Sequence, residues 1–533
     1  MLTRKACEPL WGGTGQRRKG LPASSRFSRD YAGQVSPGSL KRRQPSIDRL
    51  FYQCYFKMQM RILLVNPRDQ DDARVPGPSR ITSVQHQYSP PLGLMYLKSF
   101  LERETVFSIK LWNGQAPKVS GWAGLEKVLD AFQPELVGIT TTSFSWYGAL
   151  QSARVVRKKC PSAHIVMGGV HVWIYPEETL GQKEVDSVAL SEGEYTLLEL
   201  SQALSQKSSL WGIKGLWFKQ EGKIIRNPMR EPEKNPDRFP FPDRSEFAPR
   251  QYRLSADRLA PAAIIITGRG CPFHCTFCCS LDHNYRERSP ENIVQEMLLC
   301  KELGYRSVDF YDDTFNITRK RVMAVCDKIL AREVELPWIC RCRVNNVDEE
   351  MISRMAEAGC ERIQFGIESA SQEILDRIKK GITIEQSRSA VRLAQKHGIL
   401  ALGYYMLGFP GEKIEQAKAT IRFAFELNTD FAVFQNLFPA PGSEIYSQAL
   451  ADPQFGGDYL REFARNPAPR FKVKIWETAV SEQKLSRLLS RAYFIYYFRP
   501  GYILRTLARL GSFEDFITKL KSAWTILITS LFP

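Results

Sequence analysis

The sequence lacks the features that would place the protein in a membrane or outside the cell. No apolar run reaches the roughly 18 to 20 residues that a membrane-spanning helix needs. The chain also does not open with the charged segment and apolar stretch of a signal peptide, although it contains 12 cysteines. We therefore expect a reduced, cytoplasmic setting, with membrane contact that is peripheral at most.

Acidic residues are scarce at the start of the chain. Residues 1–57 hold twelve lysines and arginines against three acidic residues, so this segment carries +9 of the net charge of +17. It is rich in Gly, Ser, Pro and Arg without periodicity, and we expect a disordered tail over residues 1–59. Met58 and Met60 precede an apolar strand, which favours a translation start at one of them. A basic RNA-binding arm is the alternative, but the tail lacks interleaved aromatic residues that stack on bases, so no nucleic-acid partner is expected.

The length of 533 residues is too great for one core, and two or three domains are expected. Residues 60–204 alternate apolar strands with helices. The expected strands cover residues 61–65, 107–112, 136–140, 164–167 and 187–190, and the expected helices cover residues 91–101, 148–158 and the segment from 195. This alternation predicts an α/β domain with a doubly wound, Rossmann-like parallel sheet that binds ligands at the carboxyl ends of its strands.

Proline density marks the next boundary. Residues 205–260 are proline-rich and are expected to form a linker that carries a hairpin at residues 215–225. Residues 261–450 alternate again, with six expected strands at residues 263–267, 307–311, 338–343, 362–366, 402–407 and 432–437.

The end of the chain, residues 451–533, is expected to be helical. An aromatic stripe on residues 481–496 indicates a core helix or a lid over the substrate. Two basic amphipathic helices are expected to follow, at residues 504–510 and 513–532. Contact of these helices with a membrane surface is a minority alternative.

The most specific motif is formed by Cys271, Cys275 and Cys278, in a loop after the first of the six strands. Separations of three and two residues let a loop turn three thiolates toward one 4Fe-4S cluster, whose fourth iron then has no protein ligand. A structural zinc site fits less well, because zinc takes four ligands in paired C-x2-C units and no second pair has that spacing. Cys279 is expected to be a bystander, since its adjacency to Cys278 strains chelation of one metal.

This CxxxCxxC motif resembles the signature of the radical S-adenosylmethionine (SAM) family, which uses a partial (β/α)6 TIM barrel. The resemblance implies that SAM chelates the free iron and is cleaved reductively to a 5'-deoxyadenosyl radical. It also implies that residues at the strand ends bind SAM. An acidic pair binds the amino group and an arginine binds the carboxylate or the ribose. A Glu-Ser pair binds the ribose, and a glycine lies beside the adenine. The residues assigned to SAM in this way are the aromatic residue of the cysteine loop and six residues at strand ends: Phe277, Asp312, Asp313, Arg343, Glu368, Ser369 and Gly408.

The first half of the chain resembles the cobalamin-binding domain of one branch of this family. A Gly-Gly-x-His sequence and a Glu-Gly-Glu turn match that branch, in which small residues leave room for the corrin and its tail. No Asp-x-His-x-x-Gly follows the first strand, so the resemblance implies cobalamin bound with its tail away from the cobalt, or a degenerate domain that binds none. The residues assigned to cobalamin are Ser143, Gly168, Gly169, His171, Glu192 and Gly193, with an ordinary loop histidine as an equal alternative for His171.

The resemblance implies a radical SAM enzyme, with cobalamin-dependent methylation of an unactivated carbon as the first hypothesis. Radical oxidative cyclisation or rearrangement of a porphyrin- or lipid-like substrate is the alternative. An iron–sulfur electron carrier or a non-catalytic cobalamin-binding module is the non-enzyme alternative, although a carrier would not need the strand-end set around Glu368 and Gly408. The expected partners are a small-molecule substrate, with a hydrophobic one as an option, and a flavodoxin- or ferredoxin-type reductant.

Overall fold

The structure is a computed structural model, and it describes residues 60–68, 70–74, 90–116, 121–246, 249, 261–280, 282–508, 510 and 513–531. All of these belong to one compact unit, Lys57–Pro533. The expected tail at residues 1–59 lies outside the described residues, and so do the residues around the predicted translation start at Met58. Within the described part, no helix combines the length and the apolar character needed to cross a membrane.

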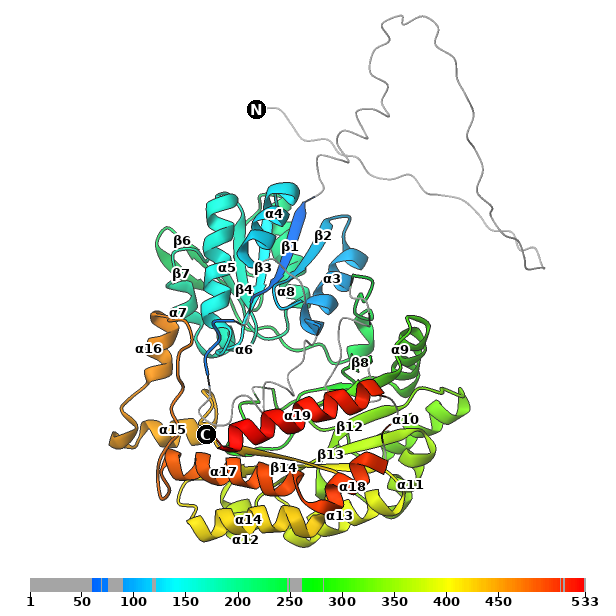
Figure 1. Cartoon of the computed structure of the whole chain (residues 1–533). Helices are drawn as coiled ribbons and strands as arrows, with labels where there is room; N and C mark the ends of the chain where they lie inside the picture. Colours follow the sequence, from blue (N-terminus) through cyan, green and yellow to red (C-terminus); the bar gives the residue numbers. More distant parts are fainter. Residues whose placement is uncertain are drawn as a thin grey trace, which may run out of the picture. The chain divides into compact units, whose positions relative to one another are not determined.

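The first sheet begins with five parallel strands in the order β2-β1-β3-β4-β5 (Figure 1). Five of the six residues of β1 are buried, as expected for a strand covered by helices on both faces. The observed strands lie within two residues of the expected ones: β1 Arg61–Asn66, β2 Ser108–Asn113, β3 Leu136–Thr140, β4 His164–Gly168 and β5 Ser187–Ala189. The helices of this half are α3 Leu92–Glu104, α4 Gly121–Phe132, α5 Trp146–Lys159, α6 Val170–Ile174, α7 Pro176–Leu180 and α8 Glu194–Ser205.

The expected hairpin is present, but it is part of the first sheet and not of a linker. Strands β6 Leu216–Gln220 and β7 Lys223–Arg226 extend the sheet, and β6 pairs antiparallel with β5. Glu221 and Gly222 both have positive φ, the conformation that a tight two-residue hairpin turn requires. Leu216 and Phe218 are buried in the core of the first half, which explains why the hairpin docks there. The first sheet is therefore mixed, with the five expected parallel strands followed by an antiparallel hairpin that lies beyond residue 204.

The second sheet contains six parallel strands that follow one another in chain order, β8-β11-β12-β13-β14-β15. They are β8 Ala262–Ile265, β11 Ser307–Phe310, β12 Trp338–Cys342, β13 Cys360–Glu368, β14 Leu400–Leu407 and β15 Phe431–Asn436. A short ribbon of β9 Gly268–Arg269 and β10 Arg286–Glu287 follows β8. The helices between the strands are α9 Pro290–Glu302, α10 Arg319–Ala331, α11 Glu349–Glu357, α12 Gln372–Arg377, α13 Ile384–Lys396 and α14 Ile414–Leu427.

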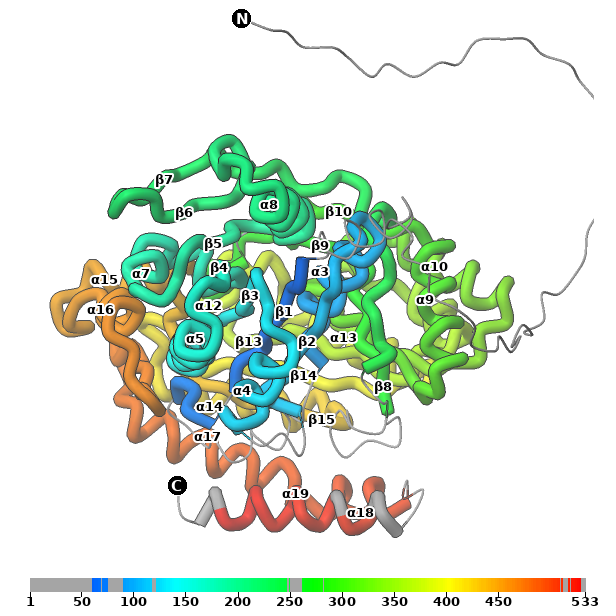
Figure 2. The backbone as a smooth tube through the Cα atoms, turned by 90° about the horizontal axis from the view of Figure 1, so that it is seen from above, coloured from blue at the N-terminus to red at the C-terminus, as the bar shows by residue number. Residues whose placement is uncertain are grey.

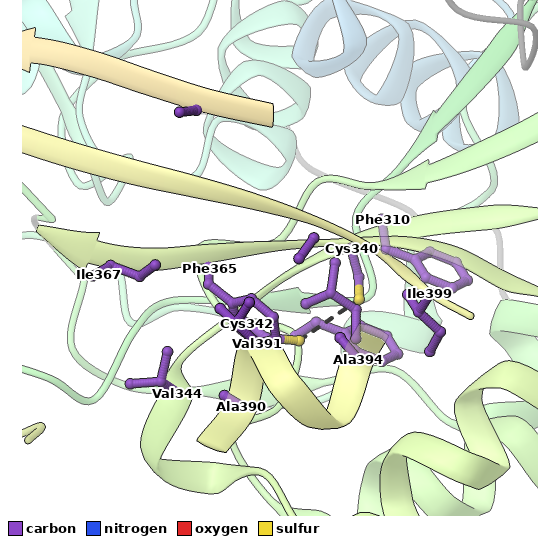
Figure 3. Packing of buried hydrophobic residues seen from close by; sticks show 14 of the residues in the cluster. Phe310, Cys340, Cys342, Val344, Phe365, Ile367, Ala390, Val391, Ala394 and Ile399 are labelled. Atoms are coloured by element: carbon purple, nitrogen blue, oxygen red, sulfur yellow. Dashed lines mark hydrogen bonds between the residues drawn. The ribbon is translucent and has the colours of Figure 1, made fainter. Parts of the chain in front are cut away.

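The two faces of the second sheet differ in chemistry. On the face covered by helices, Cys340, Cys342 and Phe365 lie against Val391 of α13 in one buried apolar cluster (Figure 3). Burial raises the pKa of both thiols well above its usual value, so they remain protonated and pack as small apolar groups. Because side chains alternate along a strand, Arg341 of β12 projects from the opposite face.

The chain ends in a helical region that covers the edge of the second sheet. Tyr493 of α17 accepts a hydrogen bond from the Phe434 backbone N–H (3.0 Å) and donates one to its carbonyl (2.9 Å). In the same way, the Tyr497 hydroxyl accepts a hydrogen bond from the Ala432 backbone N–H (3.1 Å) and donates one to the Ala432 carbonyl (2.8 Å). The expected aromatic stripe is therefore core that caps the edge strand β15. The helices of this region are α15 Glu444–Leu450, α16 Tyr459–Arg465, α17 Glu482–Tyr497, α18 Pro500–Ala508 and α19 Phe513–Leu531.

Candidate active site

The cysteine loop follows the β9 strand and is fixed at three points. The φ of Gly270 is +79°, and a Cβ there would lie 2.5 Å from the Asn284 carbonyl, so only glycine fits. The Cys271 N–H donates to the Asp282 carbonyl (3.0 Å), and the Thr276 N–H donates to the Ile378 carbonyl (3.0 Å). These bonds hold the loop between β10 and the segment after α12.

The three predicted cluster ligands share this loop but do not form a finished metal site. Cys271 and Cys275 are half-buried and Cys278 is exposed. Among the residues that the structure describes, no three ligand side chains lie close enough together to hold a metal ion. Although part of the Cys278 residue is open to solvent, desolvation of its sulfur by the surrounding loop, with smaller contributions from neighbouring groups that include Asp313, raises the pKa of Cys278 to about 11. Three sulfur donors nonetheless suit a cubic cluster that leaves one iron for SAM, so the donor set fits.

Arg343 comes directly after β12 and reaches the cysteine loop. Its guanidinium lies 3.6 Å from the Cys275 sulfur and 3.8 Å from the centre of the Phe273 ring. The side chain also donates to the Lys380 carbonyl, and the residue is only 5% exposed. A buried cation at this position can balance the negative charge of a thiolate-bound cluster and can meet a carboxylate brought by SAM.

Glu368, at the end of β13, forms a buried ion pair with a residue that the sequence did not single out. Its Oε1 lies 2.7 Å from Nζ of Lys380, and both side chains are less than 10% exposed. A Cβ on Gly366 would lie 2.8 Å from both groups, so the glycine makes room for the pair. The Lys380 Nζ is also 5.6 Å from the centre of the Phe277 ring in the cysteine loop. Lys380 thus lies between Glu368 and Phe277 and links the end of β13 to the cysteine loop.

The two residues of the acidic pair have different environments. Asp312 is buried, and its carboxylate accepts hydrogen bonds from the backbone N–H groups of Thr267 (2.6 Å) and Gly268 (3.2 Å) and from the Thr267 hydroxyl. Arg321 lies 3.5 Å away on the same carboxylate. Asp312 therefore fixes the turn after β8, and its binding of the SAM amino group stays a prediction. Asp313 is exposed, and its negative charge contributes to the raised pKa of Cys271 and of Cys278.

Two further residues assigned to SAM, Gly408 and Ser369, are packed against other parts of the chain. A Cβ on Gly408 (φ +88°) would lie 2.7 Å from Leu485 of α17, so the space beside this glycine is filled by the protein itself. The Gly408 N–H donates to the buried Glu412 carboxylate at 2.6 Å. Ser369 is fully buried, and its hydroxyl accepts from the Ser371 N–H at 3.1 Å. Gly408 and Ser369 do follow the ends of their strands, as predicted, but the packing of the surrounding chain determines which groups each of them contacts.

The cobalamin candidates at the ends of β3 and β4 lie together. Ser143 Oγ is 3.2 Å from Nδ1 of His171, whose ring is stacked on Trp146 at 4.4 Å between ring centres. His171 is fully buried, and burial lowers its pKa to about 3, so the ring is neutral. Its Nε2 has no hydrogen-bond partner among the described residues. The histidine thus supports the loop through its contacts with Ser143 and Trp146.

The glycines fit a cofactor cradle better than the imidazole does. Gly169 has a φ of +104°, and a Cβ there would lie 2.5 Å from the Thr141 carbonyl, so the two loops can approach only without a side chain. Gly168 ends β4 beside it. This close approach brings the loops after β3 and β4 together at the carboxyl edge of a parallel sheet, where proteins of this fold class bind their ligands. The residues present therefore fit cobalamin at the ends of β3 and β4.

Glu192 and Gly193, which were also assigned to cobalamin, lie in the turn after β5. Glu192 Oε1 lies 3.0 Å from Arg269 and 2.8 Å from Arg286, the two arginines of the β9–β10 ribbon. Glu194 adds a second contact to Arg269 at 2.7 Å. Gly193 is packed beside Leu97. The turn after β5 thus joins the carboxyl edge of the first sheet to the segment that carries the cysteine loop.

A second set of polar side chains lies on the face of the second sheet opposite the cluster of Cys340, Cys342 and Phe365. Arg341 is 2.9 Å from Asp309 and stacks at 3.7 Å over the Tyr311 ring. On the neighbouring strands, the Tyr404 hydroxyl donates to Gln364 at 2.6 Å. The motifs did not indicate these residues, because they alternate with core residues inside strands. Strand periodicity was the signal that could have found them.

The fold and this site define a class of enzyme with two cofactor-binding halves, one built for a large organic cofactor and the other for an iron–sulfur cluster. Comparison with known proteins agrees. Residues 265–424 match the radical SAM superfamily, and residues 81–201 match the B12 binding domain. The chain belongs to the radical SAM superfamily, in the branch that carries a B12-binding domain, and it is an enzyme of that family.

Individual relatives span most of the chain. A Pyrococcus horikoshii protein named as an uncharacterized methyltransferase, PH0819, is 35% identical over 84% of this chain and 94% of its own length. An anaerobic magnesium-protoporphyrin IX monomethyl ester cyclase from Rubrivivax gelatinosus is 27% identical over 68% of this chain and 66% of its own. Among solved structures, the radical SAM methyltransferase TsrM from Kitasatospora setae, with cobalamin and a 4Fe-4S cluster bound, has a TM-score of 0.67. It is 19% identical and the match covers 89% of this chain and 100% of that one, so it shows the fold alone.

Proposed function

We propose that this protein is a cobalamin-dependent radical SAM methyltransferase that acts on an unactivated carbon. The observation that carries the proposal is the junction at Arg269, two residues before Cys271, with Glu192 and Glu194 of the first sheet. It ties the edge expected to hold cobalamin to the loop expected to hold the cluster. Cobalamin would supply the methyl group and the cluster the radical, and both would have to reach the same carbon, so the two edges have to meet.

The finer architecture belongs to this proposal. We assign the second sheet and its helices to a partial (β/α)6 barrel over residues 261–450, followed by a helical region over residues 451–533. The first, Rossmann-like domain then runs from residue 60 through the β6–β7 hairpin. That shortens the proline-rich linker to the residues between Arg226 and 260.

Residue roles follow from the contacts described above. Cys271, Cys275 and Cys278 would hold the cluster, and Gly168, Gly169 and Ser143 would adjoin cobalamin. Together these cofactors supply reductive cleavage of SAM and transfer of a methyl group. Arg343 binds the SAM carboxylate and Asp313 its ammonium group, because each carries the opposite charge beside the cysteine loop. Glu368 accepts from the ribose hydroxyls, with Phe277 packed beside it.

The substrate is proposed to lie against the polar face formed by Asp309, Tyr311, Arg341, Gln364 and Tyr404. This set offers hydrogen bonds and a stacked cation, which favour a small molecule with polar groups over a purely hydrophobic one. Cleavage of SAM needs one electron, and a flavodoxin- or ferredoxin-type protein is the proposed donor. Radical cyclisation or rearrangement is the second candidate function, because one relative is named as a cyclase.

The test is anaerobic reconstitution with iron, sulfide and hydroxocobalamin, followed by turnover with dithionite and SAM. We expect four irons and one cobalamin per chain, with formation of 5'-deoxyadenosine and S-adenosylhomocysteine. Formation of 5'-deoxyadenosine without S-adenosylhomocysteine would favour the cyclase instead. Cys275→Ala should abolish the cluster absorbance, whereas the matched variant Cys279→Ala should retain it. Equal iron content in the two variants would contradict the ligand assignment.

A further inference from the structure

The last three helices expose an unusual amount of apolar surface. More than half of the large apolar side chains that are exposed in the described part of the chain lie on α17, α18 and α19. Leu504 is 67% exposed and Leu507 49% on α18, and Leu520 is 55% and Trp524 62% exposed on α19. Contiguous apolar surface on a soluble domain marks an interaction site. Nothing in the proposed chemistry uses this surface.

The exposed residues form stripes on neighbouring helices. Leu520 and Trp524 are four residues apart and share one side of α19, and Leu504 and Leu507 share one side of α18. Both α18 and α19 contact α17, and Figure 2 shows the two helices at the edge of the molecule. We call this surface, defined by the exposed side chains of α17, α18 and α19, the C-terminal apolar surface.

The charge on α17, α18 and α19 is predominantly positive. Residues 483–513 contain six lysines and arginines and no acidic residue, and residues 516–531 contain two lysines and no acidic residue. Glu514 and Asp515, at the start of α19, are the only acidic residues between these segments. Exposed basic side chains include Arg487 and Arg491 on α17 and Lys521 on α19. An apolar stripe bordered by cations is complementary to an anionic lipid surface.

A hollow beside the apolar stripe of α18 adds an independent observation. It has a volume of about 430 Å³ and is lined by Asn428, Arg499, Gly501, Tyr502, Leu504 and Arg505. The Arg505 guanidinium is held there by the Asn428 side chain at 2.8 Å. Two arginines in one open hollow suit a phosphodiester group, because guanidinium groups bind phosphate oxygens in pairs. The hollow shares Leu504 with the apolar surface, so a phosphate bound there would have its acyl chains beside the stripe.

We propose that the C-terminal apolar surface binds the surface of an anionic phospholipid membrane. Leu504, Leu507, Leu520 and Trp524 enter the interface between headgroups and acyl chains. Arg505 binds a lipid phosphate, and the surrounding cations attract the anionic headgroups. The protein is thereby held at the membrane without crossing it. This inference is independent of the reaction that the protein catalyses.

The test is flotation of the full chain with vesicles in a density gradient. We expect the protein to float with vesicles of equal parts phosphatidylglycerol and phosphatidylcholine, and to float several-fold less with phosphatidylcholine alone. High salt should weaken the binding. The double variant Leu520→Ser, Trp524→Ser should lose most of the bound fraction, whereas the matched control Trp211→Ser, a 61% exposed tryptophan on the first half, should not.

A second pair of variants separates charge from folding. Arg505→Gln and Lys521→Glu should each weaken binding to the anionic vesicles by about fivefold or more, with unchanged melting temperature. Lys320→Glu, an exposed lysine on α10, serves as the charge control. Retained flotation of all variants would place the binding elsewhere, for example on residues 1–59, and would overturn the proposal. A switch from dimer to monomer in Leu520→Ser, Trp524→Ser without any lipid binding would overturn it as well.

Discussion

Lys379 and Lys380 are neighbours in the sequence but have opposite environments. Lys379 pairs with Glu444 at the surface, where both side chains are about half exposed, whereas Lys380 pairs with Glu368 in the interior. A surface pair contributes little to stability, but removing one partner of a buried pair leaves a charge without compensation. The contrast provides a prediction in which each lysine is the control for the other.

We expect Lys380→Met to lower the free energy of unfolding by about 3 kcal/mol or more, and Lys379→Met to change it by less than about 1 kcal/mol. Adding Glu368→Gln to Lys380→Met should restore most of the loss, because the unpaired buried carboxylate is then removed. Denaturant titration measures all three. At the site, Lys380→Met should raise the KM for SAM more than it lowers kcat. Equal stabilities of the two single lysine variants would show that the interior pair does not matter.

At the scale of one element, α17 closes the sheet edge that β15 would otherwise leave open. Tyr493 and Tyr497 satisfy both backbone groups of Phe434 and Ala432 through their hydroxyls. Edge strands invite pairing with other chains, and a helix that donates hydroxyls to the edge prevents it. The sequence showed the aromatic stripe of this helix but not the strand that it covers.

We expect Tyr493→Phe to destabilise the protein by about 1 to 3 kcal/mol, because it leaves a buried N–H and C=O without partners while the ring remains. Hydrogen exchange read by mass spectrometry should rise in the peptide that contains β15. Tyr311→Phe is the control, since the Tyr311 side chain is 48% exposed. Unchanged exchange in β15 would mean that the hydroxyl does not protect the edge.

At the scale of the whole molecule, the sequence predicted what is local and missed what is distant. Alternating strands and helices located the parallel strands of both sheets, and the spacing of Cys271, Cys275 and Cys278 identified the cofactor family. The partner of Glu368 is 12 residues away, and the partner of Glu192 is 77 residues away in the other half of the chain. No local period encodes such contacts. The hairpin was recognised from its turn, but its docking onto β5 depends on the burial of Phe218, which only the assembled core decides.

The junction at Arg269 offers a prediction about how the two sheets depend on each other. Arg269 lies between the carboxylates of Glu192, in the turn after β5, and Glu194, at the start of α8, and it also stacks on Phe239, 4.5 Å from its ring centre. If this junction couples the halves, the protein unfolds in one calorimetric transition and Arg269→Gln separates it into two. A double-mutant cycle of Arg269→Gln and Glu194→Gln should give a coupling of about 1 kcal/mol or more. Arg319→Gln is the matched control, because Arg319 also contacts two carboxylates, those of Asp348 and Glu350, but is about half exposed and lies within one half. The same single transition in all variants would contradict the coupling. In that case the ion pairs of Arg269 do not couple the two halves, and local packing alone would position the cluster loop against the cobalamin edge.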